Sequence, residues 1–303
     1  MFTGLRVSLH FRTTWAGWFP VIVVQKELMS TTEVPLVCGT DYEGMDISWR
    51  HEGTPLPMGG NRITVTVEAT MGGSYTCHDN VGTVLKHQLL LVQLNNTNHN
   101  KILKRTGEAD DIKCLSKNYS GIFHCSWQWS PDRVGAVVHV SAERSSGKDN
   151  ITCSVDEGGS GITCMDQFQC SYAEELDYIN LSVYVRYMYH LEEYSSKFSI
   201  TDIVKPDRID ITKVDGNTFQ LEYPKTWSVP DSYFPLTFHV KVMPLKKGWD
   251  CKHDSERVLE SFTRNRTFSV DNKREFRLCV RAQDKLCNSS WSDWNHYEVK
   301  RMK

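Results

Sequence analysis

Ten cysteines are spread along this chain of 303 residues, and none of them stands in a Cys-x-x-Cys arrangement. Structural zinc sites and thioredoxin-like sites place their cysteines in such close pairs, whereas disulfide frameworks scatter them. A chain of this length divides into two or three domains of about 100 residues each. We therefore expect several domains, stapled by disulfides, in an oxidising compartment.

Six Asn-x-Ser/Thr sequons support this compartment, because only chains that enter the secretory pathway meet the glycosyl transferase. The candidate glycosylation sites are Asn95, Asn118, Asn150, Asn180, Asn265 and Asn288. The formal net charge is −2, from 35 basic and 37 acidic side chains, and this balance argues against nucleic acid as the main partner. The sequence predicts a secreted, extracellular glycoprotein.

The two ends of the chain bear on whether the protein is secreted and whether it is anchored in a membrane. Arg6, His10 and Arg12 interrupt the opening residues, which therefore lack a clean secretory signal. The apolar run 15–24 is either a poor signal or the first strand of a mature domain. No other window holds the ~18 to 20 apolar residues that cross a bilayer, and only residues 295–303 follow the last tryptophan. We expect a receptor-like ectodomain without a membrane anchor.

Short strand-like runs recur along the chain, with Gly, Pro, Asn and Asp between them, as in antiparallel sandwiches. Examples are residues 63–67, 89–92, 137–140, 181–185 and 236–242. Helical periodicity is absent. A polar stretch at 95–100 and a proline at position 206 mark two boundaries, since proline disfavours helix and stiffens a connection. The expected domains span residues 20–94, 95–204 and 205–303.

The first of these domains carries an immunoglobulin pattern. Cys38, Trp49 and Cys77 have the order and spacing of an inter-sheet disulfide and the tryptophan that packs on it. Tyr75 lies two residues before the second cysteine, in the tyrosine-corner position. An unrelated disulfide with a core tryptophan is the alternative. Four features in register favour an Ig-like sandwich in which these residues are structural.

The second domain holds two close cysteine pairs. Cys114 and Cys125 are eleven residues apart, as are Cys153 and Cys164, which is the separation of bridges between adjacent strands. Spacing alone does not fix the pairing. Together with Trp127, which follows the first pair, the four cysteines resemble the upper fibronectin type III domain of class I cytokine receptors.

The third domain supplies the matching half of that receptor pattern. The stretch from Trp291 through Trp294 to Asn295 resembles the Trp-Ser-x-Trp-Ser box, with asparagine in place of the last serine. Arg277 and Arg281 lie four apart on a predicted strand, so both face one side and are expected to stack between the two indoles, at ~0.5 to 2 kcal/mol per pair. Solvated strand arginines are the alternative. The predicted fold is all-β, an N-terminal Ig-like sandwich followed by two fibronectin type III domains.

Longer segments narrow the resemblance to one family. The family is that of the interleukin-12 beta subunit, which is shared by interleukin-12 and interleukin-23. The stretches that resemble it are residues 117–125, 223–230, 232–238 and 280–284. The match covers about residues 20 to 300. It implies a secreted, non-enzymatic subunit that pairs with a four-helix alpha subunit into a heterodimeric cytokine acting on cytokine receptors of immune cells. A soluble decoy or adhesion-type Ig-fibronectin protein is the alternative.

The resemblance also implies residue roles. Cys170 would form the interchain disulfide with the alpha subunit, although an internal partner among Cys251, Cys279 and Cys287 stays open. Asp284 would receive an arginine of the alpha subunit, and an ordinary turn aspartate is the alternative. Tyr233 and Phe234 are further candidate contacts, and the alternative is that both belong to the core. Glu174 is another candidate contact, and the alternative is a solvated surface charge.

Enzyme motifs are lacking. There is no His-Glu-x-x-His, no Gly-x-Ser-x-Gly and no phosphate-binding glycine loop in a strand-to-helix context. We therefore expect no catalytic residues, no cofactor and no metal. Lys246, Lys247 and Lys252 form a weak basic cluster that either binds heparan sulfate weakly or is simply a solvated loop.

Overall fold

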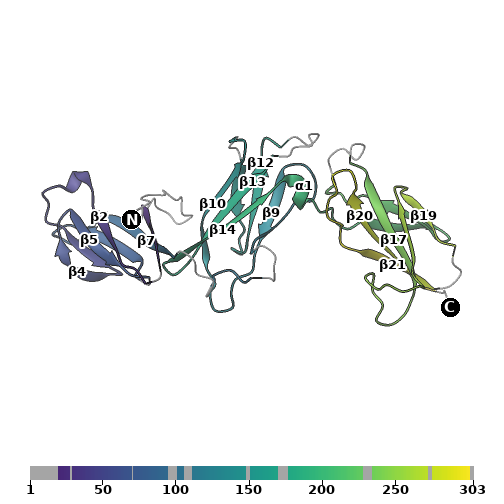
Figure 1. The fold of residues 1–303 in the computed structure, drawn as a ribbon, viewed down its shortest axis with the longest axis horizontal. Coiled ribbons are helices and arrows are strands. Elements are labelled where there is room, and N and C mark those ends of the chain that lie inside the picture. Colours follow the sequence, from purple (N-terminus) through teal and green to yellow (C-terminus); the bar gives the residue numbers. More distant parts are fainter. Residues whose placement is uncertain are drawn as a thin grey trace.

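The computed structural model describes residues 20–27, 29–69, 71–94, 101–105, 111–147, 151–169, 177–227, 234–271 and 275–300. Three β domains follow one another along an elongated molecule, with the N-terminal domain at one end and the C-terminal domain at the other (Figure 1). The described residues are nearly all in strands, turns and loops, which confirms the predicted fold class. No helix in this part of the chain has the length and hydropathy needed to span a membrane.

The first domain is a sandwich of two sheets joined by the disulfide Cys38–Cys77. One sheet pairs β2 (Thr32–Val37) with β5 (Arg62–Val67). The other contains β4 (Thr54–Gly59), β3 (Ser48–His51), β6 (Gly73–His78), β7 (Val84–Leu94) and β1 (Val21–Lys26), and a 3-10 turn, η1, covers Thr40–Tyr42. Trp49 is fully buried beside the disulfide, and its indole nitrogen donates to the Gly60 carbonyl at 2.9 Å.

The first two domains share one continuous sheet. The end of β7 pairs in parallel with the start of β14 (His190–Phe198) of the second domain. Val21 and Leu91 pack there against Val138 and Leu191 in a separate buried cluster. Because both backbone pairing and apolar packing cross this junction, the two domains are firmly connected.

The second domain is also a two-sheet sandwich. One sheet has the order β11 (Ile151–Val155), β12 (Gly161–Asp166), β9 (Ile122–Ser126) and β8 (Lys113–Leu115). The other packs β10 (Ala136–Arg144) and β13 (Ile179–Tyr187) beside β14. The disulfides Cys114–Cys125 and Cys153–Cys164 join residues directly opposite each other on neighbouring strands.

The third domain has the three-plus-four strand arrangement of a fibronectin type III fold. The smaller sheet contains β15 (Asp210–Asp215), β16 (Thr218–Glu222) and β19 (Thr267–Ser269). The larger contains β18 (Leu259–Thr263), β17 (Leu236–Pro244), β20 (Phe276–Asp284) and β21 (Asn295–Val299), with the disulfide Cys251–Cys279 on its outer side. α1 (Ile200–Ile203), capped by Ser199 and Asp202, leads into this domain (Figure 1).

Candidate partner-binding site

Backbone hydrogen bonds fix the elbow between the second and third domains. The Ser116 amide donates to the Ile203 carbonyl at 2.9 Å, and the Lys205 amide donates back to Ser116 at 2.8 Å. The Ser290 amide donates to Val204 at 2.9 Å. The loop after β8, the end of α1 and the loop before the tryptophan box therefore meet at one point.

Asp284 lies at this elbow and is completely buried. It is the last residue of β20, paired with Leu236 of β17. Its Oδ1 accepts from the Leu286 amide at 2.8 Å, and its Oδ2 accepts from the Tyr119 hydroxyl at 2.7 Å. Tyr119 belongs to the loop between β8 and β9, so this side-chain bond joins the second domain to the third.

An aromatic cluster surrounds the bond. The Tyr119 ring, 3% exposed, stacks on Phe234 at 4.5 Å between centroids and meets Trp227 edge-on at 5.8 Å. The Trp227 indole nitrogen donates to the Phe234 carbonyl at 3.2 Å. Burial, and then the Asp284 carboxylate, raises the pKa of the Tyr119 hydroxyl far above its ordinary range. The hydroxyl therefore stays protonated and donates to the carboxylate.

The carboxylate has unused acceptor capacity. An aspartate side chain accepts about four hydrogen bonds, and Asp284 accepts one at each oxygen. No lysine or arginine within the described ranges forms an ion pair with it. Carboxylates are almost never fully buried without a cationic partner. The arrangement is therefore suited to receive a further donor that carries positive charge.

Two neighbours complete this environment. The Cys287 thiol, half-buried, lies within hydrogen-bonding reach of the Tyr119 hydroxyl. Leu286 is 61% exposed although its amide reaches the buried carboxylate, so the β20 end is close to the surface.

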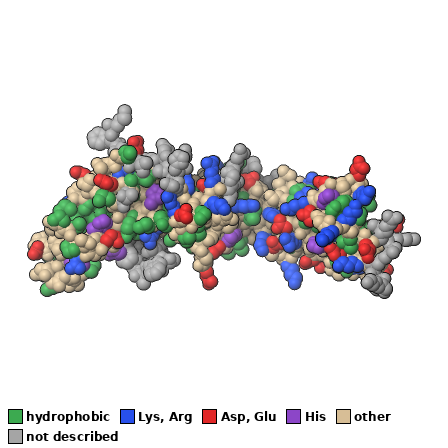
Figure 2. All heavy atoms as spheres, turned by 90° about the horizontal axis from the view of Figure 1, so that it is seen from below, with side chains coloured by type: hydrophobic (Ala, Val, Ile, Leu, Met, Phe, Trp, Pro, Cys, Tyr) green, Lys and Arg blue, Asp and Glu red, His purple; other side chains and the backbone are tan. Residues whose placement is uncertain are grey.

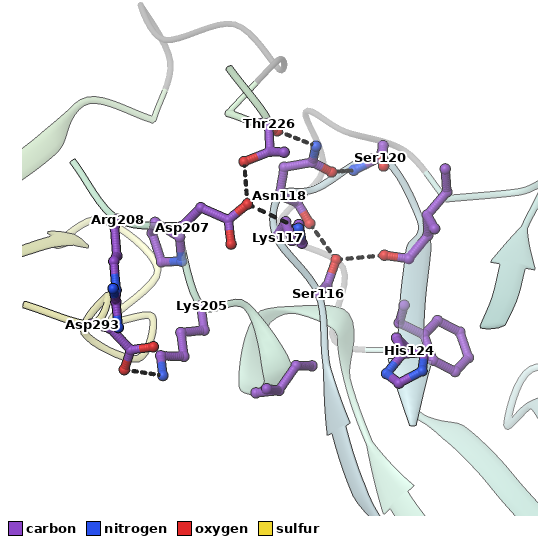
Figure 3. Close-up of a pocket in the computed structure, with 14 residues that line it drawn as sticks. Ser116, Lys117, Asn118, Ser120, His124, Lys205, Asp207, Arg208, Thr226 and Asp293 are labelled. Atoms are coloured by element: carbon purple, nitrogen blue, oxygen red, sulfur yellow. Dashed lines mark hydrogen bonds and ion pairs between the residues drawn. The ribbon is translucent and has the colours of Figure 1, made fainter. Parts of the chain in front are cut away.

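A groove lined by both polar and apolar side chains lies beside the elbow, between the two domains (Figure 3). The Lys117 ammonium pairs with Asp207 at 3.0 Å, and the Lys205 ammonium pairs with Asp293 at 2.7 Å. The Asn118 amide group donates to the Thr226 carbonyl across the domain boundary at 2.6 Å. The groove charges are thus largely paired within the chain. On the face in Figure 2, basic side chains lie interspersed with acidic ones over the second and third domains.

The tryptophan box differs in part from the expectation. The Arg281 guanidinium lies 4.7 Å from the Trp291 ring and 4.5 Å from the Trp294 ring, as predicted for a cation stacked between two indoles. Arg277 stacks on neither indole within the described residues and pairs instead with Glu298 at 2.7 Å. The Lys241 ammonium lies 5.5 Å from the Trp294 ring.

The remaining predicted site residues fall into three groups. Cys170, Glu174, Tyr233, Asn95 and Asn150 lie outside the described residues. The sequon residues Asn180, Asn265 and Asn288 are exposed, whereas Asn118 is half-buried. The lysines Lys246, Lys247 and Lys252 are exposed, and their weak heparan sulfate binding stays a prediction.

Tyr119 was not among the predicted site residues, although it lies inside a segment that carried the resemblance. No local signal identifies it, because its contact with Asp284 spans 165 residues of sequence. A tyrosine in the fourth position of a polar loop is ordinary by itself. The β8–β9 loop lies at the boundary between the second and third domains, and this position brings the Tyr119 hydroxyl to the Asp284 carboxylate.

Comparisons with known proteins agree with this architecture. A family model described as "Cytokine interleukin-12p40 C-terminus" matches residues 109–187. Interleukin-12 subunit beta of Homo sapiens is 32% identical over 286 residues, covering 86% of this chain and 84% of the relative. The subunits of Mesocricetus auratus and Sigmodon hispidus are 30% and 31% identical, each covering 92% of this chain and 96% of the relative. Since the identity extends over all three domains, the chain belongs to the interleukin-12 subunit beta family.

Proposed function

We propose that this chain is a secreted subunit of a heterodimeric cytokine, that it pairs with a four-helix alpha subunit at the elbow between the second and third domains, and that the pair acts on cytokine receptors of immune cells. The observation that carries the proposal is the fully buried Asp284 carboxylate, which lacks a cationic partner in the described part of the chain. Family membership supports the same assignment.

The chemistry of the elbow favours an arginine from the partner. A guanidinium is planar and always charged, binds a carboxylate through two parallel hydrogen bonds, and stacks on aromatic faces. Asp284 offers the spare acceptor sites, and Tyr119 and Phe234 offer the adjacent rings. A lysine would provide the charge without the fork or the stacking surface.

Cysteine pairing supports a covalent link through Cys170. Cys251 and Cys279 bond to each other, so two of its three possible internal partners are occupied. Cys287 remains as the internal alternative, and it lies at the elbow beside Tyr119. An interchain disulfide from Cys170 would add to the non-covalent contact at Asp284.

The test is co-expression with candidate four-helix cytokines, followed by non-reducing electrophoresis of the medium and affinity measurements in a Cys170→Ser background. Asp284→Asn keeps the shape but removes the charge, and the partner's arginine is left without its counter-ion. We expect a loss of ~2 to 5 kcal/mol, an affinity at least about 30-fold weaker.

Asp293→Asn is the matched control, because Asp293 is an exposed carboxylate that pairs with Lys205 in the neighbouring groove. It should change the affinity by less than about threefold. Equal effects of the two substitutions on the affinity would show that Asp284 does not contact the alpha subunit. Binding to cell surfaces or to other copies of the chain, with no helical partner captured, would favour the decoy or adhesion function.

A further inference from the structure

One of the candidate glycosylation sequons, residues 118–120, is built into the elbow. Asn118 and Ser120 are half-buried, and Tyr119 between them is 3% exposed. The Asn118 Nδ2 donates to the Thr226 carbonyl oxygen of the third domain at 2.6 Å, and Figure 3 shows the carboxamide turned toward Thr226. This nitrogen is the atom that an N-linked glycan modifies. The contact between the domains and a glycan therefore compete for the same atom.

The carboxamide is held in this orientation from its other end. Its Oδ1 accepts from the Ser120 amide at 2.8 Å, which closes an Asx turn. The buried Ser116 hydroxyl lies 2.7 Å from the carbonyl oxygens of both Asn118 and Ile122, so the backbone is held at both ends of the turn. Turning Nδ2 toward solvent would break both side-chain bonds of Asn118.

The acceptor is fixed as well. The Thr226 hydroxyl donates to Asp207 Oδ2 at 2.8 Å, and the Lys117 ammonium lies 3.0 Å from the same oxygen. Lys117 and Asn118 of the second domain thus contact Asp207 and Thr226 of the third. An N-linked glycan replaces a hydrogen of Nδ2 with a bulky, hydrated sugar, which needs open surface around the nitrogen. At Asn118 the third domain lies against this nitrogen.

Asn265 provides the contrast. It is exposed in the loop between β18 and β19, and Thr267 completes its sequon. Its backbone amide donates to Thr263 Oγ1 at 3.0 Å, and within the described ranges no hydrogen bond uses its side chain. A glycan on Asn265 would therefore displace no hydrogen bond of this carboxamide.

We propose that Asn118 carries no glycan in the secreted protein and links the second and third domains through its carboxamide, whereas Asn265 is a glycan acceptor. The inference rests on secretion, which is part of the proposed function. In glycan transfer, Nδ2 of an asparagine bonds to the anomeric carbon of a lipid-linked pyrophosphate oligosaccharide and gives up one proton. The bond from that carbon to the pyrophosphate breaks, and the lipid pyrophosphate leaves. Because transfer takes place before the chain folds, a chain that received a glycan on Asn118 could not close this elbow and would not be secreted.

Site mapping of the secreted, unsubstituted protein tests the assignment. Peptide N-glycosidase in heavy-oxygen water converts each asparagine that carried a glycan into a labelled aspartate, which mass spectrometry locates. We expect the Asn118 peptide to be unlabelled and the Asn265 peptide to be labelled. A labelled Asn118 peptide, or an unlabelled Asn265 peptide in a protein labelled at other sequons, would overturn the inference and leave secretion intact. A chain that stays in the cells with no sequon labelled would overturn secretion and this inference with it.

Two substitutions separate the sequon from the hydrogen bond. Ser120→Ala destroys the sequon but keeps the Asn118 carboxamide and the backbone amide that closes the turn. Asn118→Asp also destroys the sequon, and it keeps the acceptor oxygen of the turn but loses the Nδ2 donor. We expect Ser120→Ala to leave the electrophoretic mobility and the urea midpoint unchanged, and Asn118→Asp to lower the midpoint by about 0.5 M. Asn265→Gln is the positive control, and its loss of a glycan should increase the mobility.

The two substitutions also give the outcomes that contradict the proposal. An equal increase of mobility in Ser120→Ala and Asn118→Asp would show that Asn118 carries a glycan, and equal urea midpoints would overturn its linking role. Secretion of Ser120→Ala but not of Asn118→Asp would support the linking role, because only the second variant lacks the donor to Thr226.

Discussion

Tyr119→Phe removes one hydroxyl and isolates the hydrogen bond that crosses the elbow. The ring keeps its stacking on Phe234, while the Asp284 carboxylate loses one of its two donors. Hydrogen bonds to charged groups contribute about 1.5 to 3 kcal/mol to stability. Because Tyr119 is 3% exposed and Asp284 is fully buried, water cannot readily replace the donor. We expect a loss of about 2 kcal/mol from the unfolding free energy of the joined second and third domains.

Urea unfolding followed by tryptophan fluorescence measures this loss, since Trp227 lies edge-on to the Tyr119 ring. With an m-value of about 2 kcal/mol/M, the midpoint should fall by about 1 M. Tyr178→Phe is the control, because Tyr178 is an exposed tyrosine of the same domain. A midpoint shift no larger than that of the control would refute the idea that this bond stabilises the elbow.

Two further outcomes are expected. Cys170→Ser should leave the chain folded and secreted but abolish its covalent link to an alpha subunit, and peptide mapping that finds Cys170 in an internal bridge would contradict this. Lowering the pH through about 6.5 should destabilise the third domain, because burial, opposed by Glu260 and reinforced by Arg281, lowers the pKa of His239. The unfolded state then binds more protons, so this contribution is present above that pH and is lost below it. In thermal melts at several pH values, the stability of His239→Asn should fall less steeply below about pH 6.5 than that of the unsubstituted chain.

Much of the fold could be predicted from local patterns. Cys38, Trp49 and Cys77 specify an inter-sheet disulfide with its tryptophan, and the structure joins the two cysteines around a buried indole. Alternation of apolar residues fixes which face of a strand is buried, as in β5, where every second residue is inside. The comparisons confirm the expected family, interleukin-12 subunit beta.

The two arginines expected at the tryptophan box have different neighbours in the structure, for a physical reason. Period-two alternation correctly puts Arg277 and Arg281 on one face of β20, but it does not say what lies opposite each. In the register of β20 with β21, Arg277 faces Glu298, and the ion pair takes its guanidinium away from the indoles. Register depends on the whole sheet, so this contact was not accessible from the strand sequence.

The elbow shows a second limit of sequence reasoning, and it changes how Asp284 should be tested. If Asp284 were an exposed carboxylate at the end of a loop, Asp284→Ala would weaken partner binding far more than folding. Full burial and the bond to Tyr119 mean that Asp284→Ala would also leave the Tyr119 hydroxyl and the Leu286 amide without their acceptor. Such groups cost about 1 to 3 kcal/mol each when buried and unsatisfied. Asparagine, which retains an acceptor oxygen, is therefore the substitution that separates the two roles.

The same geometry links partner binding to the angle between the domains. Asp284 belongs to the third domain and Tyr119 to the second, so a guanidinium that joins their hydrogen bond would hold both at once. If it added to the bond, using the spare acceptor sites, the elbow would become stiffer when the alpha subunit binds. If it displaced the hydroxyl, the elbow would lose the charged hydrogen bond between Tyr119 and Asp284. Because Tyr119→Phe removes the hydroxyl beforehand, an unchanged or stronger affinity indicates displacement, and a weaker one indicates that both donors act together.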